Sequence, residues 1–114
     1  MQRDDAYLLD ILIASRKAIK YLEDLPWKQF IISELHQDAV VRSLEIIGEA
    51  ARLVSTPTRE AYPEIPWEKM IGLRNRLIHE YFRIDLTTIW DTVHDDLPDL
   101  VRMMESLIPS DDGV

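Results

Sequence analysis

The chain has 114 residues, of which 46% are hydrophobic and none is cysteine, and its formal net charge is −8. This length suits a single domain, and the lack of cysteine excludes disulfide bridges and thiolate metal sites. The acidic balance argues against broad, sequence-independent coating of nucleic acid.

The N-terminal segment has the pattern of an amphipathic helix over residues 4–25, with apolar side chains at three- and four-residue steps. Its first residues are acidic where a signal peptide needs positive charge, and no apolar run approaches the roughly 18 residues of a membrane span. We therefore expect a soluble, cytoplasmic protein with no membrane partner. Pro26 should end or bend this helix, because its ring disfavours a helical conformation of the preceding residue.

A second helix is predicted to begin at Ser33 or Asp38, either of which can cap it, and to run to about Val54. Its apolar face should include Leu35. We interpret the sequence "GEAA", residues 48–51, as a packing motif that lets another helix approach closely, rather than as a ligand site. The next twelve residues contain three prolines, which predicts a connector with at most one short helical turn.

The third helix should begin at Pro66, where a missing amide leaves no partner unpaired, and should extend to about Phe82. Asp85 is a candidate cap for a fourth helix, whose apolar pattern continues almost to the end of the chain. Pro98 lies inside this pattern and removes a backbone hydrogen bond, so we expect a kink or a split there. Four main helices with short connections predict an all-α, up-and-down antiparallel bundle that forms one domain over residues 1–114.

The third helix carries the run "GLRNRLIHEYF", in which polar and titratable groups crowd into about two turns. Counting about 100° per residue from Arg74, the core-facing stripe falls between about 260° and 340° and consists of Met70, Leu73, Leu77 and Tyr81. On the same count, Asn75 lies near 100° and His79 near 140°, so both share a flank with Arg74. Tyr81 would then be an aromatic residue at the edge of the core.

Arg74, Asn75 and His79 combine a bidentate cationic donor, an amide and a titratable imidazole. Metal-independent RNA cleavage needs such groups, because one must move a proton and a cation must stabilise charge on the phosphorus centre. One histidine per chain is thin for both acid and base, but a two-fold dimer would supply a second. A metal site is disfavoured, since the sequence has no HExxH motif, no cysteine pair and no repeated ExxH. An ordinary surface pair is the alternative.

The same region is the only basic part of the chain, because residues 69–83 contain four basic residues and one acidic residue. Lys69, Arg76 and Arg83 are therefore candidate RNA contacts beside Arg74. The acidic remainder should repel RNA everywhere except at this basic cleft. Solvated helix charges without a binding role are the competing interpretation.

"RNRLIH" followed by "EY" resembles the R-x4-H-x-Y signature of HepT-like proteins in the HEPN superfamily. Residues 39–54 and 62–100 are also similar to that family in kind and order. The resemblance implies a helical bundle that dimerises, with the arginine and histidine of both subunits lining a composite cleft. It further implies a ribonuclease used as a toxin, without a cofactor, and paired with an MNT-type nucleotidyltransferase as antitoxin.

Carried over to this sequence, Arg74 and His79 match the catalytic pair, and Asn75 matches the polar residue that commonly follows the arginine. Tyr81 matches the tyrosine that accepts AMP from the nucleotidyltransferase, which silences the toxin. The resemblance thus implies an endoribonuclease toxin of a type II HEPN/MNT toxin–antitoxin system, acting as a homodimer. Two alternatives stay open: a non-catalytic helical partner that is an AMPylation substrate, and a dimerising bundle whose polar motif only caps an interface.

Overall fold

The computed structural model describes residues 2–80 and 83–108, with side chains from Asp4 onward. The regular structure in these ranges is helical. Its elements are α1 (Gln2–Leu22), α2 (Trp27–Phe30), α3 (Glu34–Leu53), α4 (Thr56–Ala61), α5 (Trp67–His79), α6 (Leu86–Asp91), the π-helical turn η2 (Thr92–Asp96) and α7 (Leu97–Leu107). The predicted all-α class is confirmed. None of the helices within these ranges is long and apolar enough to cross a membrane.

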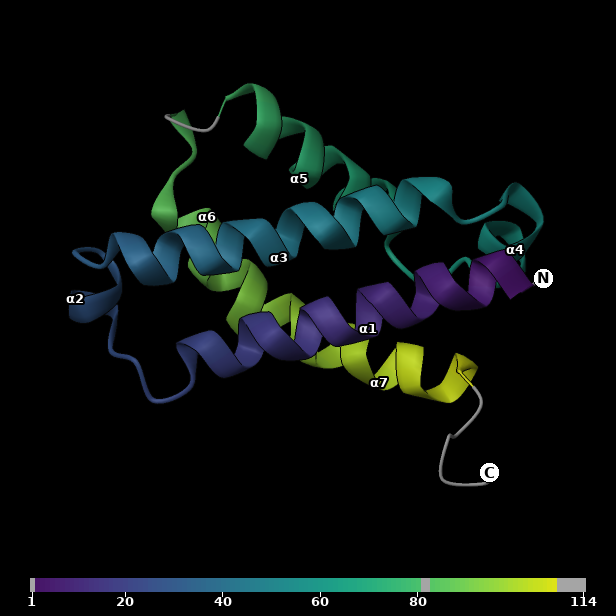
Figure 1. The fold of residues 1–114 in the computed structure, drawn as a ribbon, viewed down its shortest axis with the longest axis horizontal. Helices are drawn as coiled ribbons and strands as arrows, with labels where there is room; N and C mark the ends of the chain where they lie inside the picture. Colours follow the sequence, from purple (N-terminus) through teal and green to yellow (C-terminus); the bar gives the residue numbers. More distant parts are fainter. Residues whose placement is uncertain (1, 81–82, 109–114) are drawn as a thin grey trace.

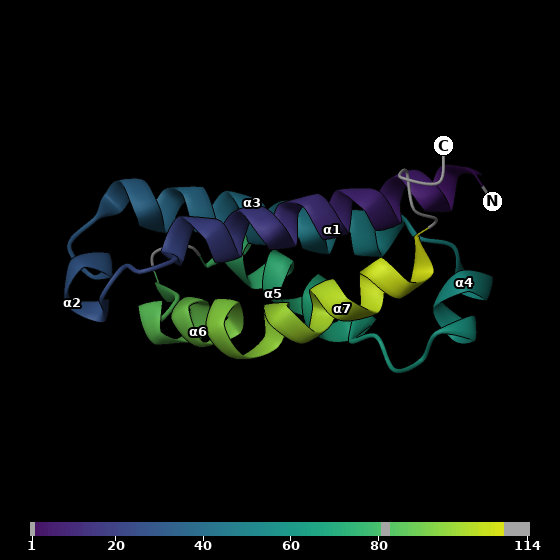
Figure 2. The same ribbon diagram turned by 90° about the horizontal axis from the view of Figure 1, so that it is seen from below.

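The long helices form an up-and-down antiparallel bundle, as predicted. α1 and α3 lie side by side in opposite directions and make one layer, while α6, η2 and α7 make a second layer behind them (Figures 1 and 2). α5 runs antiparallel to α3 and packs along it (Figure 1). The chain's start and α4 lie at one end of the bundle, and α2 lies at the other. α3 is therefore the element that both α1 and α5 contact.

One continuous apolar core fills the space between these helices. Its members include Leu8, Ile11, Leu12, Leu22, Phe30, Val40, Leu44, Ile47, Ala51, Leu77, Ile89, Val93, Leu97, Leu100 and Met104. Most were expected from the three- and four-residue spacing of apolar letters. Leu35 was wrongly expected on the buried face, since its side chain is 78% exposed. At about 100° per residue, Leu35 lies about 140° from Val40, on the solvent side of α3.

The connection between α1 and α3 is shorter in helix and richer in turns than predicted. α1 ends at Leu22, three residues early, and Asp24 adopts the left-handed conformation with φ 60°. Pro26 then starts the unpredicted helix α2, since its carbonyl accepts hydrogen bonds from the amides of Gln29 and Phe30 at 3.0 Å each. Phe30 is fully buried, which anchors this short helix to the core.

Two predicted helix caps are present. Ser33 caps α3 and accepts a hydrogen bond from the His36 amide at 3.3 Å, so Ser33 rather than Asp38 begins this helix. Asp85 caps α6 through the Thr87 amide at 2.9 Å. Both caps depend on residues two or three positions apart, which sequence patterns describe well.

The predicted interruption at Pro98 takes the form of the π-helical turn η2, which lies just before that proline. The Leu97 amide donates to the carbonyl of Thr92, five residues earlier. A proline at 98 has no amide for the His94 carbonyl and its ring crowds that oxygen, which the wider π turn relieves. The helix therefore changes geometry there without a loop.

α4 and the start of α5 depart slightly from the prediction. α4 has six residues, more than the single turn expected in the proline-rich connector. Pro66 is the cap of α5 rather than its first helical residue, and α5 ends at His79 instead of near residue 82. The buried carboxylate of Asp4 explains α4, because it accepts hydrogen bonds from the Ser55 amide (3.0 Å), the Ser55 hydroxyl (2.6 Å) and the Thr58 hydroxyl (2.6 Å).

Candidate active site on the third long helix

α3 and α5 touch where Gly48 faces Arg74. A Cβ atom added to Gly48 would lie 2.1 Å from the Arg74 Cβ and 2.7 Å from the Met70 carbonyl oxygen. Only glycine avoids these overlaps, so Gly48 allows the backbone of α3 to contact α5 directly. The neighbouring Ala50 and Ala51 are buried as well. The packing interpretation of "GEAA" is thus correct for three of its four residues.

The fourth residue of that motif, Glu49, contacts the predicted catalytic arginine. Arg74 Nη2 lies 3.1 Å from Glu49 Oε1, and Arg74 Nη1 donates to Asn75 Oδ1 at 3.0 Å. The Arg74 side chain is only 25% exposed. Its Nε is buried and has no hydrogen-bond partner among the described residues. The guanidinium is therefore held between a carboxylate from α3 and an amide from its own helix.

Glu49 is itself fixed by Arg52, one turn later on α3. Arg52 Nε donates to Glu49 Oε1 at 3.2 Å and Arg52 Nη2 donates to Oε2 at 2.7 Å. The hydrogen bonds from Arg52 lower the pKa of Glu49, and the charges of Arg52 and Arg74 lower it further, against an opposing effect of burial. Glu49 therefore stays ionised near neutral pH and bridges two guanidinium groups.

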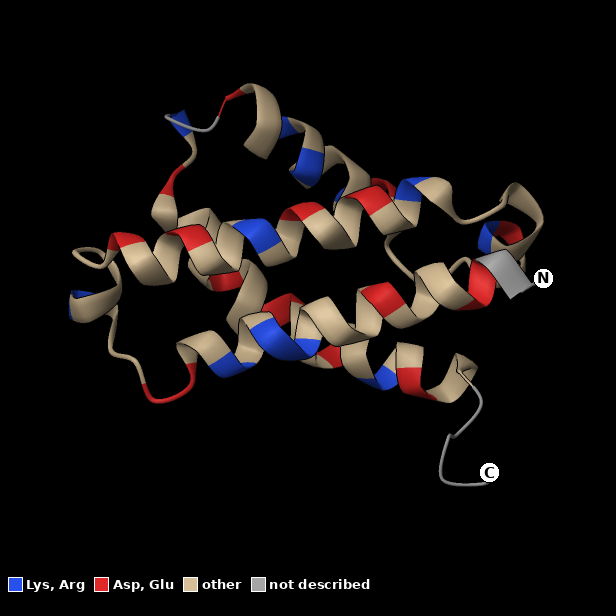
Figure 3. Cartoon of the chain, in the orientation of Figure 1, with Lys and Arg blue, Asp and Glu red and all other residues tan. Residues whose placement is uncertain are grey.

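Arg74 lies in a groove of about 230 Å³ between α1, α3 and α5, called here the Arg74 groove. Its lining consists of Tyr7, Asp10, Arg42, Glu45, Ile46, Glu49, Ala50, Leu53, Arg74 and Ile78. Three carboxylates and two guanidiniums therefore share it, and acidic and basic residues alternate along this part of α3 (Figure 3). The groove is mixed in charge, whereas the sequence led us to expect a basic cleft.

The other predicted catalytic residues lie at different places on α5. Asn75 and His79 are both exposed, and His79 is the last residue of the helix, beyond the groove lining. The structure thus brings Arg74 and Asn75 into contact and leaves His79 on the open surface. Tyr81, the predicted AMP acceptor, lies outside the described residues.

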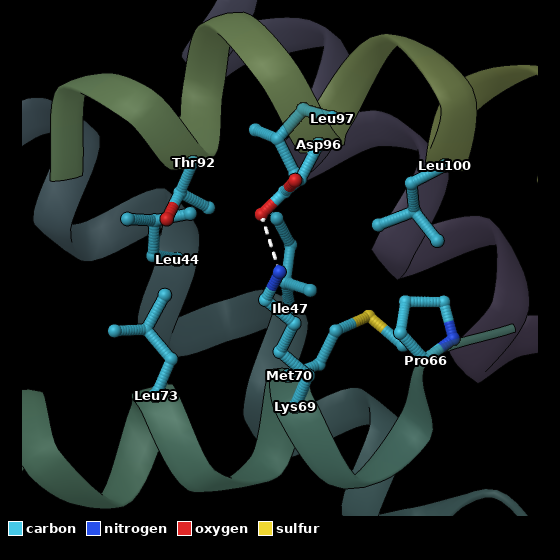
Figure 4. A pocket seen from close by; sticks show the side chains of 10 residues that line it. All are labelled: Leu44, Ile47, Pro66, Lys69, Met70, Leu73, Thr92, Asp96, Leu97 and Leu100. Atoms are coloured by element: carbon cyan, nitrogen blue, oxygen red, sulfur yellow. Dashed lines mark ion pairs between the residues drawn. The ribbon is translucent and has the colours of Figure 1, made fainter. Parts of the chain in front are cut away.

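The three predicted RNA contacts differ in the same way. Lys69 Nζ lies 2.9 Å from Asp96 Oδ2, so this lysine pairs with a carboxylate of η2 (Figure 4). Arg76 and Arg83 are exposed. Two of the four basic residues in the region, Lys69 and Arg74, are thus paired with carboxylates from other helices.

The Lys69–Asp96 pair spans a small apolar crevice of about 40 Å³ between α5 and the second layer (Figure 4). Its wall is formed mainly by Leu44, Ile47, Met70, Leu73, Leu97 and Leu100. These side chains belong to the core and its margin, which gives the crevice a packing role. Within residues 2–80 and 83–108, no group of three or more histidine, aspartate or glutamate side chains is arranged to hold a metal ion.

A sequence model of the family described as "Ribonuclease HepT-like" matches residues 11–107. The chain belongs to this family. Known relatives agree: a protein of Methanocaldococcus jannaschii named "Putative RNase MJ1380" is 42% identical over 100 residues, which cover 88% of this chain and 92% of the relative. The "Probable ribonuclease HepT" of Thermococcus cleftensis is 38% identical over 101 residues, covering 89% and 92% respectively. No solved structure matches this chain.

Family membership confirms the resemblance drawn from "RNRLIHEY" and the expectation of a HepT-like ribonuclease. The roles of Arg74, Asn75, His79 and Tyr81 remain predictions. Sequence reasoning missed Glu49 and Arg52. Their spacing of three residues predicts that they pair with each other on one helix face. Their contact with Arg74 depends on how α3 and α5 align, which no local pattern reveals.

Proposed function

We propose that this chain is a metal-independent endoribonuclease that acts as the homodimeric toxin of a type II HEPN/MNT toxin–antitoxin system. One observation carries the proposal: the Arg74 guanidinium is held at a groove, by Glu49 and Asn75, on the helix that ends with His79. Family membership supplies the reaction class. RNA is the substrate in this proposal.

The chemistry follows from the two side-chain types. The ribose 2′-oxygen attacks the adjacent phosphorus, the bond to the 5′-oxygen breaks, and a cyclic phosphate forms. His79 takes the proton from the 2′-hydroxyl or gives one to the leaving 5′-oxygen. Arg74 stabilises the negative charge that develops on the phosphoryl oxygens. Since each chain offers one such histidine, a second copy would supply the complementary acid or base.

An apolar rim around the Arg74 groove supports the homodimer. Leu53 and Ile78 line the groove and are 40% and 45% exposed, and Ile13 is 42% exposed in a neighbouring hollow between α1 and α3. Covering these side chains with a second copy removes apolar surface from water. A two-fold axis through this face would bring two Arg74 grooves towards each other.

Adenylylation of Tyr81 is the proposed means of silencing. The phenolic oxygen attacks the α-phosphorus of ATP on the nucleotidyltransferase, releases pyrophosphate and retains AMP. Tyr81 follows His79 by two residues in the sequence. A phosphodiester anion added there could pair with Arg74 and exclude the RNA phosphate. The resemblance to the HEPN signature motivates this step.

Cleavage assays on purified protein test the nuclease. Cleavage of RNA should persist in the presence of a chelator and should be lost in Arg74→Ala and in His79→Ala, while circular dichroism shows that both variants stay folded. Since Arg74 and His79 act on the same phosphodiester, either loss should abolish turnover. Unchanged cleavage in either variant would contradict the proposed roles.

The second candidate function is a non-catalytic partner and AMPylation substrate of a nucleotidyltransferase. The ion pair between Arg74 and Glu49 favours it, because an arginine already paired with a carboxylate is less free to bind phosphate. Incubation with the nucleotidyltransferase and ATP should add the mass of one AMP, and Tyr81→Phe should abolish the addition. An unchanged mass of the wild-type chain argues against this candidate and against the silencing step.

A further inference from the structure

Glu49 is placed to control the geometry of Arg74, although the two residues belong to different helices and lie 25 positions apart. We propose that Glu49 is a positioning residue that aligns the Arg74 guanidinium for phosphate, and that Arg52 holds Glu49 in place for this task. This inference rests on the proposed ribonuclease function, because it assigns a role towards the arginine of that site.

Contacts fix the Arg74 side chain along its whole length. Its Cβ and Cγ lie over Gly48, where an added Cβ would be only 2.1 Å and 2.9 Å away. Nε is buried, and the two terminal nitrogens contact Glu49 and Asn75. A long side chain held at its stem and at its tip loses little further freedom when it binds a ligand. Alignment before binding is what a transition-state contact requires.

The charges around Glu49 favour alignment over simple masking of Arg74. Glu49 makes two hydrogen bonds with Arg52 and one ion-pair contact with Arg74, so a single carboxylate bridges two guanidiniums. This trio keeps a net charge of one positive unit, which still attracts a phosphate. From α1, Asp10 also lines the groove, and Glu45 lies one turn before Glu49 on α3, paired with Arg42 at 3.8 Å.

Steady-state RNA cleavage by the full chain tests the inference. Glu49→Ala should lower kcat by roughly tenfold to a hundredfold with KM changed by less than about threefold, because misalignment acts mainly on the transition state. Glu49→Gln keeps an oxygen for Arg74 and should recover part of the loss. Arg52→Ala should lower kcat by a smaller factor than Glu49→Ala. A kcat in Glu49→Ala that is unchanged or higher than in the wild type would overturn the inference.

Two control variants separate positioning from charge and from folding. Glu45→Ala removes the same charge from the same groove without touching Arg74, so a kcat loss equal to that of Glu49→Ala would make the effect merely electrostatic and overturn the inference. Asp99→Ala breaks the ion pair with Arg102, which has the same i, i+3 spacing as Glu49 and Arg52 but lies on α7. It should leave kcat and KM unchanged.

A second readout does not depend on nuclease activity. The Arg74 Nε proton is buried, so NMR should show slow exchange with solvent in the wild type and exchange at least about tenfold faster in Glu49→Ala. Glu45→Ala should leave that rate unchanged. If the wild type cleaves no RNA, the proposed function fails while the exchange rates still decide whether Glu49 aligns Arg74. Equal rates in the wild type and Glu49→Ala would reject the alignment itself.

Discussion

Asp4 and Arg74 each bring a charge from one helix to another, but their surroundings differ. The Asp4 carboxylate is 5% exposed and accepts three hydrogen bonds from Ser55 and Thr58, so all its partners belong to the protein. Arg74 is 25% exposed, lines an open groove and keeps one buried nitrogen without a partner among the described residues. A closed set of contacts suits a structural junction, whereas an aligned group facing solvent suits a ligand.

The comparison predicts that changes at Asp4 alter stability, whereas changes around Arg74 alter activity first, unless they disturb the contact between α3 and α5. Gly48 is that contact, and it provides the largest expected effect on stability.

Gly48→Ala should destabilise the protein by about 2–3 kcal/mol, because the added methyl group would overlap the Arg74 Cβ and the backbone oxygen of Met70. Backbone cannot rotate away, so α3 and α5 must separate. Urea unfolding followed by circular dichroism measures this loss, and RNA cleavage should fall with it as Arg74 loses its seat.

Gly72→Ala on α5 is the matched control, since an added Cβ there would meet nothing within 4 Å. In the interior of a helix, alanine is favoured over glycine by about 0.5–1 kcal/mol, so this variant should be more stable than the wild type. Two glycines on facing helices should therefore respond with opposite signs. If Gly48→Ala is as stable as the wild type, the helices are not in contact at that point.

Asp4→Ala should cost about 1.5–3 kcal/mol, because it removes a charged acceptor from a buried site and leaves the donors of Ser55 and Thr58 unpaired. Hydrogen bonds from Ser55 and then Thr58 lower the pKa of Asp4 below its ordinary value of 3.8, against the effect of burial. A lowered folded-state pKa contributes stability above pH about 4, and this contribution disappears as the pH falls through the folded-state pKa.

Asp4→Asn separates the charge from the shape. Its unfolding free energy should depend less on pH below about 4 than that of the wild type, while its kcat for RNA cleavage stays unchanged. Equal pH dependence in the two proteins would show that Asp4 is not the titrating group. A loss of activity without a loss of stability would remove the distinction between Asp4 and Arg74.

The same two sites show which features a sequence can predict. The caps at Ser33 and Asp85 were found because cap and amide lie within three residues, and the core stripes were found because they repeat along one helix. The contact between Asp4 and Ser55 spans 51 residues, and Glu49 meets Arg74 only because Gly48 sets how closely α3 and α5 approach. Such contacts depend on helix register, which periodicity leaves undetermined.

Lys69 provides the smallest expected effect and sharpens the comparison on α5 itself. Like Arg74, it pairs with a carboxylate from another helix, but its side chain is 66% exposed and it spans an apolar crevice rather than an open polar groove. An ion pair this exposed contributes about 0–1 kcal/mol, and its replacement by an apolar chain over apolar walls offsets even that loss.

Lys69→Met should therefore change the unfolding free energy by less than about 1 kcal/mol, and thermal unfolding at low and at high salt should give nearly the same midpoint. Its effect on RNA cleavage distinguishes two roles for the lysine. If Lys69 contacts RNA, KM should rise while kcat stays the same, because a contact made equally in the ground and transition states contributes only to binding. If KM is unchanged, Lys69 serves the fold through Asp96, and the functional charge of α5 belongs to Arg74 and the exposed arginines.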